Sequence, residues 1–438
     1  MSDPGTSRTP GGRVGHAVTI VRDVGPRWAY ERTREVLRDE GIAGVLHRGR
    51  RSVDTRVSLE ARARELRVAA APESRSAFRR SVLIVSNIAI PQCRFYRVDQ
   101  KTELLRRAGL AATVVSQDDL EEALTAVQLA GTVILYRVPW SRKVETIVRE
   151  ARRVGATIVF ETDDAVYRRD LLSEDRNVKS LPRTVQLGIL RGADKFLRAM
   201  QESDLTLAST PALADDMARA TGRPSFVIAN SVDSRMQATV RGILADPLKP
   251  GTRPARSLFY GSGSRAHDED FAHALPGLVA VLRERPDTRL VVAGPVRLPD
   301  SARSVADRVL RLEPMTFGSY LRALASMDVS LAPLLPSPFN VFKSDIKLLE
   351  ATLVGVPSVV SPTVYGDSAQ HGVNALVART PSEWHDAVLS LLEDSPLGSA
   401  LVDAARSTLA HRRIDGPVTP ETRATLRALG LDVEAEDR

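Results

Sequence analysis

The fold is decided by a short run of β-branched residues, SVLIVSN at positions 81–87 of the 438-residue chain. Such a run after a charged segment predicts a buried strand that opens a domain. Similar runs follow at 112–116, 132–136, 156–161, 204–208 and 225–229. Helical patterns such as 96–109 and 141–154 lie between them. This alternation of strands and helices with short loops predicts an α/β fold with a parallel, doubly wound sheet.

A second series of the same kind begins after residues 231–256, which include the Pro- and Gly-rich stretch DPLKPGTRPA and are expected to form a linker. Its expected strands are 257–261, 289–293, 307–312, 328–333 and 357–361. Its expected helices are 268–284, 317–326, 344–354, 381–394 and 397–412. Ligands of such sheets bind beyond the carboxyl ends of the strands, so two facing domains predict a deep cleft between them.

The expected organisation follows from these two series. It comprises a basic, partly disordered and helical extension (1–80), an N-terminal Rossmann-like domain (81–230), the linker (231–256), a C-terminal Rossmann-like domain (257–412) and a tail (413–438). Residues 430–438 at the end of the tail are expected to be frayed.

The composition excludes several classes of protein. Apolar residues make up 43% and charged residues 26%, which is typical of a globular chain. The sequence has no uninterrupted apolar stretch of about 18 residues, so no transmembrane helix is predicted. The N-terminus lacks the apolar core of a signal peptide. Cys93 is the sole cysteine, which excludes an internal disulfide and a cysteine-rich zinc site and favours a cytoplasmic location.

The net charge of +7 comes from the N-terminal extension, because residues 1–80 hold 17 Arg against 10 Asp or Glu. The remaining chain is neutral and has no nucleic-acid-binding motif, so we expect no nucleic-acid partner. Within the extension, 27–50 predicts a helix with Trp28 and Tyr30 near its start. Basic residues with aromatic anchors can hold a helix at the inner face of a membrane, and a solvated or packed helix is the alternative.

The most informative segment is PFNVFKSDIKLLEATLVGVPSVVS at 338–361. It predicts a loop and then a helix that ends at Gly355. Lys343, Lys347 and Glu350 have i, i+4, i+7 spacing, which would place them on one helix face. A helix N-terminus with a lysine beside it attracts an anion, and Glu350 can accept hydrogen bonds from ribose hydroxyls. A nucleoside-diphosphate sugar would fit this pattern; a solvent-facing Lys347/Glu350 pair is the alternative.

A second segment, LFYGSGSRAHDED at 258–270, predicts a strand, a Gly-rich turn and a helix. Gly261 and Gly263 would allow a phosphate to approach the backbone, and Arg265 and His267 would supply donors. The third glycine of a dinucleotide fingerprint is absent, since Ala266 stands there. A turn without a ligand is the alternative.

These segments resemble the glycosyltransferase family 4 pattern, in its bacterial subgroup. The turn G-[ST]-x-x-H-x-x-D-F is present at 263–271, and the helix F-N-x-x-K-S-x-x-K-x-L-E-A at 339–351. The resemblance covers about 81–412. It implies a GT-B fold, a nucleotide-sugar donor bound by the second domain, and transfer with retention of configuration, with no metal or other cofactor.

The resemblance also assigns roles to residues. It makes Glu350 the ribose-binding second acid of an E-x7-E motif, whose first acid is replaced by Phe342. Arg265 matches the arginine that binds the diphosphate, with His267 or Lys343 as the second base. The expected catalytic residues are therefore Arg265, Lys343 and Glu350, and the expected donor-binding residues are Gly261, Gly263, Ser264, His267, Asn340, Ser344 and Lys347.

The first domain supplies the expected acceptor side of the cleft. PQCRFYR at 91–97 contains Tyr96 and two arginines, Arg94 and Arg97, whose guanidinium groups suit phosphate or carboxylate. This stretch is expected to contact the acceptor or the donor diphosphate. VFETDD at 159–164 places Asp163 and Asp164 after a strand, and YRVPW at 136–140 adds Arg137 and Trp140. The alternatives are arginines bonded to local acids, a helix cap, and core packing of the tryptophan.

The sequence thus predicts a retaining, hexosyltransferase-type glycosyltransferase. Its partners would be a nucleotide-sugar donor and a glycan or glycolipid acceptor in cell-surface polysaccharide or glycolipid synthesis. A non-catalytic nucleotide- or glycan-binding partner of a transferase is the alternative, motivated by Phe342. A nucleotide-sugar 2-epimerase on the same fold is a third hypothesis.

Overall fold

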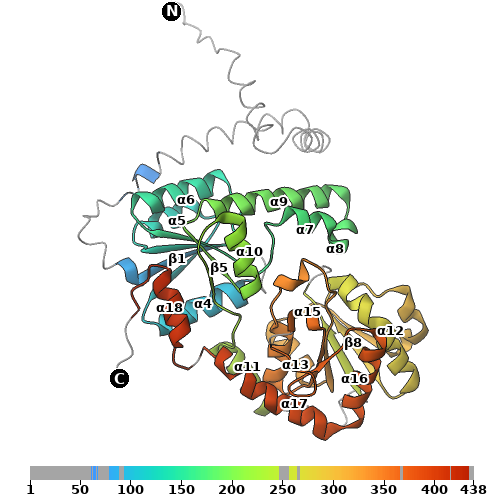
Figure 1. Ribbon diagram of the computed structural model, residues 1–438. Coiled ribbons are helices and arrows are strands. Elements are labelled where there is room, and N and C mark those ends of the chain that lie inside the picture. The colour runs from blue at the N-terminus through green and yellow to red at the C-terminus, as the bar shows by residue number, and fades with distance from the viewer. Residues whose placement is uncertain are drawn as a thin grey trace, which may run out of the picture.

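The structure, a computed structural model, consists of two α/β domains (Figure 1). It describes residues 61, 63–65, 67, 78–87, 93–245, 256–263, 267–365, 368–414 and 416–433. Each domain is built on a parallel sheet, as the alternating pattern predicts. The predicted fold class is therefore confirmed.

The first sheet has the strand order β2-β1-β3-β4-β5-β6. Its strands are β1 (Ser81–Ser86), β2 (Ala111–Ser116), β3 (Thr132–Tyr136), β4 (Thr157–Thr162), β5 (Leu205–Ala208) and β6 (Ser225–Val227). Val82 to Ser86 are buried, because β1 lies inside the sheet and helices cover both faces.

Helices connect these strands. They are the π-helix η2 (Arg94–Asp99), α4 (Gln100–Arg107), α5 (Leu120–Val127), α6 (Arg142–Arg153), α7 (Arg169–Glu174), α8 (Arg176–Lys179), α9 (Arg183–Gln201) and α10 (Pro211–Thr221). Ser141 and Thr210 cap α6 and α10 through their hydroxyl groups. The helices α7 to α9 were not expected from the sequence pattern; only Ala193, Ala199 and Met200 of α9 are buried, so its apolar stripe is weak.

The second sheet has the order β12-β11-β10-β7-β8-β9. Its strands are β7 (Ser257–Gly261), β8 (Arg289–Ala293), β9 (Val309–Leu312), β10 (Val329–Ala332), β11 (Ser358–Val360) and β12 (Leu376–Val377). Its helices are α12 (Asp268–Glu284), η4 (Asp300–Arg308), α13 (Phe317–Ala325), η5 (Asn340–Phe342), α14 (Ile346–Val354), α15 (Pro362–Tyr365), α16 (Pro381–Glu393), α17 (Ser395–Thr408) and η6 (Ala410–Arg412). The two-residue β12 was missed because it is too short to form a pattern.

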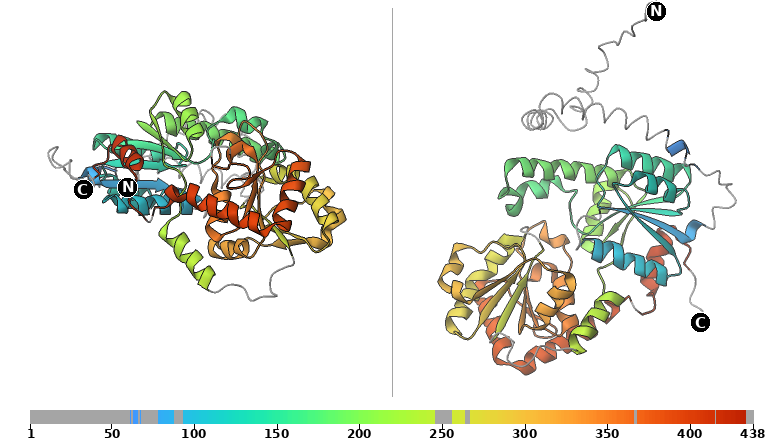
Figure 2. Two further views of the ribbon diagram at one scale, coloured as in Figure 1. Left: turned by 60° about the horizontal axis from the view of Figure 1, so that its bottom comes forward. Right: turned by 180° about the vertical axis from the view of Figure 1, so that it is seen from behind.

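The chain crosses between the domains twice. Half of the expected linker is helix α11 (Ser234–Ala245), and residues 246–255 lie outside the described residues. The tail returns to the first domain as α18 (Pro420–Ala428) and packs beside β1 and α4 (Figures 1 and 2). The expectation of a frayed end is wrong for Leu431 and Val433, which are buried in the first domain's core.

A small part of the N-terminal extension is described. Ala63 is buried in the first domain's core, and the Arg67 guanidinium lies 2.8 Å from the carboxylate of Glu150 on α6. The predicted helix at 27–50, with its aromatic anchors, lies outside the described residues. No helix in the described part of the chain is long and apolar enough to cross a membrane.

Candidate functional site

The candidate site lies where the carboxyl ends of the two sheets face each other. The loop at 334–345 of the second domain reaches the first domain there. The Lys343 ammonium lies 3.1 Å from Asp164, and the Asn230 amide donates to the Ser344 hydroxyl over 2.8 Å. Side chains from both domains therefore meet at one place, as the predicted cleft requires.

The N-terminus of α14 has the features of an anion site. Asp345 occupies the N-cap position, but among the described residues no side chain caps the helix. The Asp345 carboxylate pairs instead with Arg412, at 3.0 Å. Leu348 N–H donates to the Asp345 carbonyl over 3.0 Å, so among the described residues the first two amide groups of the helix are left for a ligand. Gly355 ends the helix with a φ of +81°, in agreement with the predicted end.

Lys343 does not belong to this helix. It has extended backbone dihedral angles and precedes the N-cap, so the prediction that it shares a helix face with Lys347 and Glu350 is wrong. The extended backbone directs its ammonium toward Asp164 of the first domain. Lys343 is therefore at the border between the domains, beside the open end of α14.

Glu350 is buried, with 6% of its surface exposed, which rules out a solvent-facing ion pair with Lys347. Its two carboxylate oxygens accept hydrogen bonds from the hydroxyls of Tyr96 and, over 2.9 Å, Tyr320. Lys347 donates to the carbonyl of Gly261. Burial raises the pKa of Glu350, and the Lys347 ammonium and the two tyrosine hydroxyls oppose that rise.

Asp270 fixes two predicted donor-site residues. One carboxylate oxygen lies 2.8 Å from Nδ1 of His267, and the other accepts hydrogen bonds from the Asn340 amide and from Leu335 N–H. Asp270 is 1% exposed. Burial lowers the pKa of His267, and the positive charge of Lys343 lowers it further. Asp270 was missed as a site residue, although the turn motif at 263–271 contains it.

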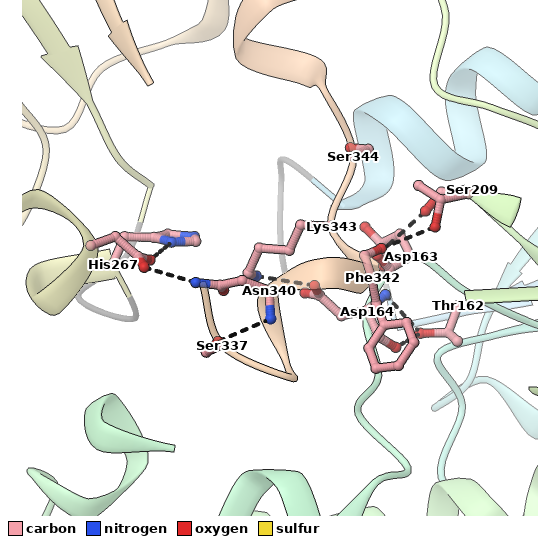
Figure 3. A network of polar contacts seen from close by, with 12 residues as sticks. Thr162, Asp163, Asp164, Ser209, His267, Ser337, Asn340, Phe342, Lys343 and Ser344 are labelled. Carbon is pink, nitrogen blue, oxygen red and sulfur yellow. Dashed lines mark hydrogen bonds and ion pairs between the residues drawn. The ribbon is translucent and has the colours of Figure 1, made fainter. Parts of the chain in front are cut away.

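The first domain contributes an ionic cluster at the ends of β3 and β4, and Figure 3 labels its two aspartates, Asp163 and Asp164. The Arg137 guanidinium lies 3.1 Å from Asp163 and 3.6 Å from Asp164. Tyr136 also donates to Asp163, over 3.0 Å. Arg137 has a φ of +48°, the left-handed region that side-chain-bearing residues rarely adopt. This local strain places the guanidinium between the two aspartates.

The predicted arginines of 91–97 occupy different environments. Arg97 is 1% exposed; it pairs with Glu161 at 2.8 Å and donates to Asn230 over 2.9 Å. Lys101 joins the same network, and burial lowers its pKa to about 8. The side chain of Arg94 is half exposed and pairs with Asp99. Neither arginine contacts the Lys343–Asp164 pair, whereas Tyr96 reaches Glu350.

The remaining predicted residues are distributed as follows. A Cβ at Gly261 would come within 2.6 Å of the Tyr320 ring, so glycine there lets this ring approach the strand end. Gly263 is exposed at the turn. Ser264 and Arg265 lie outside the described residues. Trp140 is buried, with the Arg198 guanidinium 5.0 Å from its ring centre, which agrees with the core-packing alternative.

Phe342 anchors the second domain's loop in the first domain. It is 7% exposed and packs in the cluster that contains Phe160 and Leu213. Its backbone carbonyl accepts a hydrogen bond from the Thr210 hydroxyl over 3.1 Å. The side chain at position 342 is thus directed into the first domain's core.

The described residues contain no group of three or more His, Cys, Asp or Glu side chains that could hold a metal ion. Residues 257–394, most of the second domain, match the family model described as glycosyl transferases group 1. No curated protein matches the sequence.

Solved structures support the fold over most of the chain. Alr3699/HepE from Anabaena, in complex with UDP-glucose, is 13% identical, with a TM-score of 0.50 over 80% of this chain and 99% of that chain. Sucrose-phosphate synthase from Thermosynechococcus elongatus is 13% identical, with a TM-score of 0.50 over 76% and 94%. The apo structure of OtsA is 12% identical, with a TM-score of 0.51 over 81% and 100%. The predicted GT-B fold is confirmed.

Proposed function

We propose, from the match of the second domain to glycosyl transferases group 1, that this protein is a retaining glycosyltransferase. It would transfer a hexose from a nucleoside-diphosphate sugar to a hydroxyl of a glycan or glycolipid in cell-surface polysaccharide or glycolipid synthesis. The observation that carries the proposal is the uncapped N-terminus of α14, flanked by Lys343 and followed by the buried carboxylate of Glu350.

The diphosphate would lie at the N-terminus of α14. The free N–H groups and the helix dipole stabilise negative charge there, and the Lys343 ammonium adds a full positive charge. As the bond between sugar and phosphate breaks, charge develops on the leaving phosphate, and these fixed groups stabilise it without rearrangement. Arg265 would add to this site, by the resemblance of its motif.

His267 would play a different part from a phosphate-binding cation. Its lowered pKa favours the neutral ring at pH 7, and a proton on Nδ1 would be donated to the Asp270 carboxylate. The Nε2 atom is then an acceptor. In this state His267 can accept a hydrogen bond from a hydroxyl, such as a sugar hydroxyl. Of His267 and Lys343, Lys343 would then be the one that carries a positive charge.

Glu350 would hold the ribose. A carboxylate has about four lone-pair positions, so it can accept ribose hydroxyls beside, or in place of, the tyrosine hydroxyls it now accepts. The first domain would place the acceptor hydroxyl on the same face of the sugar as the leaving phosphate, which yields retention. Metal-independent transfer is part of the proposal, and EDTA should leave the rate unchanged.

Thermal shift with UDP, GDP, ADP and dTDP, alone and as their glucose conjugates, tests the donor site. One nucleotide should raise the melting temperature by mass action, and Glu350→Gln should abolish most of the shift. Glu393→Gln is the matched control, because Glu393 pairs with Arg285 on the surface of the same domain. The absence of a shift with every nucleotide would contradict the proposal.

A non-catalytic binding role is the second candidate function. The observation that favours it is that Phe342, which replaces the first acid of the motif, packs in the first domain's core, so position 342 offers no carboxylate to a donor sugar. Product analysis of the bound nucleotide sugar separates the candidates. A transferase without an acceptor slowly hydrolyses the nucleotide sugar and releases the nucleotide. A non-catalytic partner leaves the nucleotide sugar intact. An epimerase changes the sugar while it is still attached to the nucleotide.

A further inference from the structure

The carboxylate of Asp164 is supplied by the first domain but faces the second. We propose that Asp164 binds a hydroxyl of the donor sugar, so that the first domain completes the sugar pocket of the second. The inference rests on the proposed function, and it assigns Asp164 to the donor rather than to the acceptor.

The two neighbouring aspartates differ in what they contact. Asp163 Oδ1 accepts hydrogen bonds from Tyr136, over 3.0 Å, and from Arg137, over 3.1 Å, which are both in the first domain. Asp164 Oδ1 instead lies 3.1 Å from the Lys343 ammonium of the second domain. Asp164 is thus the member of the pair that faces the proposed diphosphate site.

The backbone holds Asp164 in this position. The Thr162 hydroxyl donates to the Asp164 carbonyl over 2.8 Å and accepts from the Asp164 N–H over 3.3 Å. Thr162 is fully buried at the end of β4. Figure 3 shows Asp164 between this strand end and the side chains of Lys343 and Asn340. A group fixed in this way is suited to orienting a ligand.

Asp164 retains capacity for a ligand. Its side chain is 27% exposed, and the distance from Oδ2 to Arg137 is 3.6 Å, which is too long for a direct hydrogen bond. A carboxylate that makes one short contact has lone pairs left for hydroxyl groups. Burial opposes ionisation, but the charges of Lys343 and Arg137 lower the pKa of Asp164, so it is an acceptor at pH 7.

The acidic group of the second domain beside His267 is already in use. Asp270 is buried, and its oxygens contact His267, Asn340 and Leu335 N–H. Phe342, which immediately precedes Lys343, points into the first domain's core. A sugar attached to a phosphate at Lys343 would therefore meet Asp164 across the domain boundary.

The alternative is that Asp164 only pairs with Lys343 and fixes it for the phosphate. The two roles differ in which part of the donor they affect. A sugar contact stabilises the nucleotide sugar and leaves the free nucleotide unaffected. An ion pair that positions Lys343 affects both ligands alike, because both contain the diphosphate.

Titration calorimetry on the full chain tests this with the nucleotide identified by thermal shift, alone and as its glucose conjugate. Asp164→Asn should bind the nucleotide as tightly as the wild type, within about twofold. Its affinity for the conjugate should fall about 10- to 100-fold, the size expected for a hydrogen bond to a charged group. Asp170→Asn is the control, because it removes an acid that pairs with Arg168 on the outside of the same domain.

Conjugates in which each ring hydroxyl is replaced in turn by hydrogen provide the decisive measurement. One deoxy conjugate should bind the wild type more weakly than the glucose conjugate does. The same deoxy conjugate should bind Asp164→Asn as tightly as the glucose conjugate does. Equal losses for nucleotide and conjugate, or unchanged conjugate binding by a folded variant, would overturn the inference while the proposed function stands. Failure of the wild type to bind any nucleotide would overturn both.

Discussion

At the scale of single residues, the site is governed by buried charges and the hydroxyls that contact them. Glu350 is the clearest case: burial raises its pKa, and its two tyrosine partners come from different domains. Tyr96 belongs to the first domain and Tyr320 to the second. A ribose hydroxyl would therefore compete with a hydroxyl that also links the domains.

Removal of the Tyr96 hydroxyl tests this competition. We expect Tyr96→Phe to raise the affinity for the nucleotide, by roughly up to tenfold, because one oxygen of Glu350 loses its partner and becomes available to ribose. Calorimetry measures the change. Tyr167→Phe is the matched control, since Tyr167 donates to Asp216 within the first domain. Weaker binding by Tyr96→Phe would show that the tyrosine holds Glu350 in its productive position.

His267 predicts a pH dependence of stability. Its pKa is lowered in the folded protein, so between that value and its ordinary value, about 6.5, the unfolded chain binds more protons. The contribution of His267 to stability is therefore present above about pH 6.5 and is lost as the pH falls toward the folded pKa. The melting temperature should fall between pH 8.0 and pH 5.5, and it should fall less for His267→Gln than for wild type. An equal fall in the two proteins would argue against a lowered pKa of His267.

At the scale of elements, most strands and helices were predictable, but the helices α7 to α9, the short strand β12 and the loops that join the domains were not. The β-branched run SVLIVS coincides with β1, and α12 has the predicted bounds of 268–284. Sequence spacing placed Lys343 on a helix, but the extended backbone before α14 places it beside the first domain. The pairing of Lys343 with Asp164 joins residues 179 positions apart, and no local pattern contains such a contact.

The loop around η5 provides a prediction at this scale. Phe342→Ala should destabilise the protein by about 3–5 kcal/mol, because it leaves a cavity in the first domain's core. Chemical denaturation measures the loss. The adjacent Val341 is 43% exposed, and Val341→Ala should change the stability little. If both substitutions had the same small effect, the loop would not anchor the domains to each other.

At the scale of the whole molecule, the first domain is assembled from both ends of the described chain. Val418, Leu426, Leu429, Leu431 and Val433 pack with Val82 and Ile84 of β1. The composition of the tail gave no sign of this, since an amphipathic helix does not reveal which domain it covers. The strands of the two sheets lie in 81–227 and 257–377, one sheet after the other in the sequence, and the tail then returns to the first domain.

Truncation tests the role of the tail. A chain that ends at residue 413 should have a lower melting temperature, because apolar side chains on the face of the first sheet would become exposed. A chain that ends at residue 433 retains these contacts and should melt as the full-length protein does. Equal melting temperatures for all three chains would show that α18 contributes no stability.

The same return of the chain sets an order for folding during synthesis. The ribosome releases residues 257–394, the segment that carries the strands of the second sheet, before α18. The first domain, although its strands are synthesised first, must wait for the last of its core side chains. Until then α4 alone covers only part of this face of the first sheet, so the half of the protein that begins first is the half that is completed last.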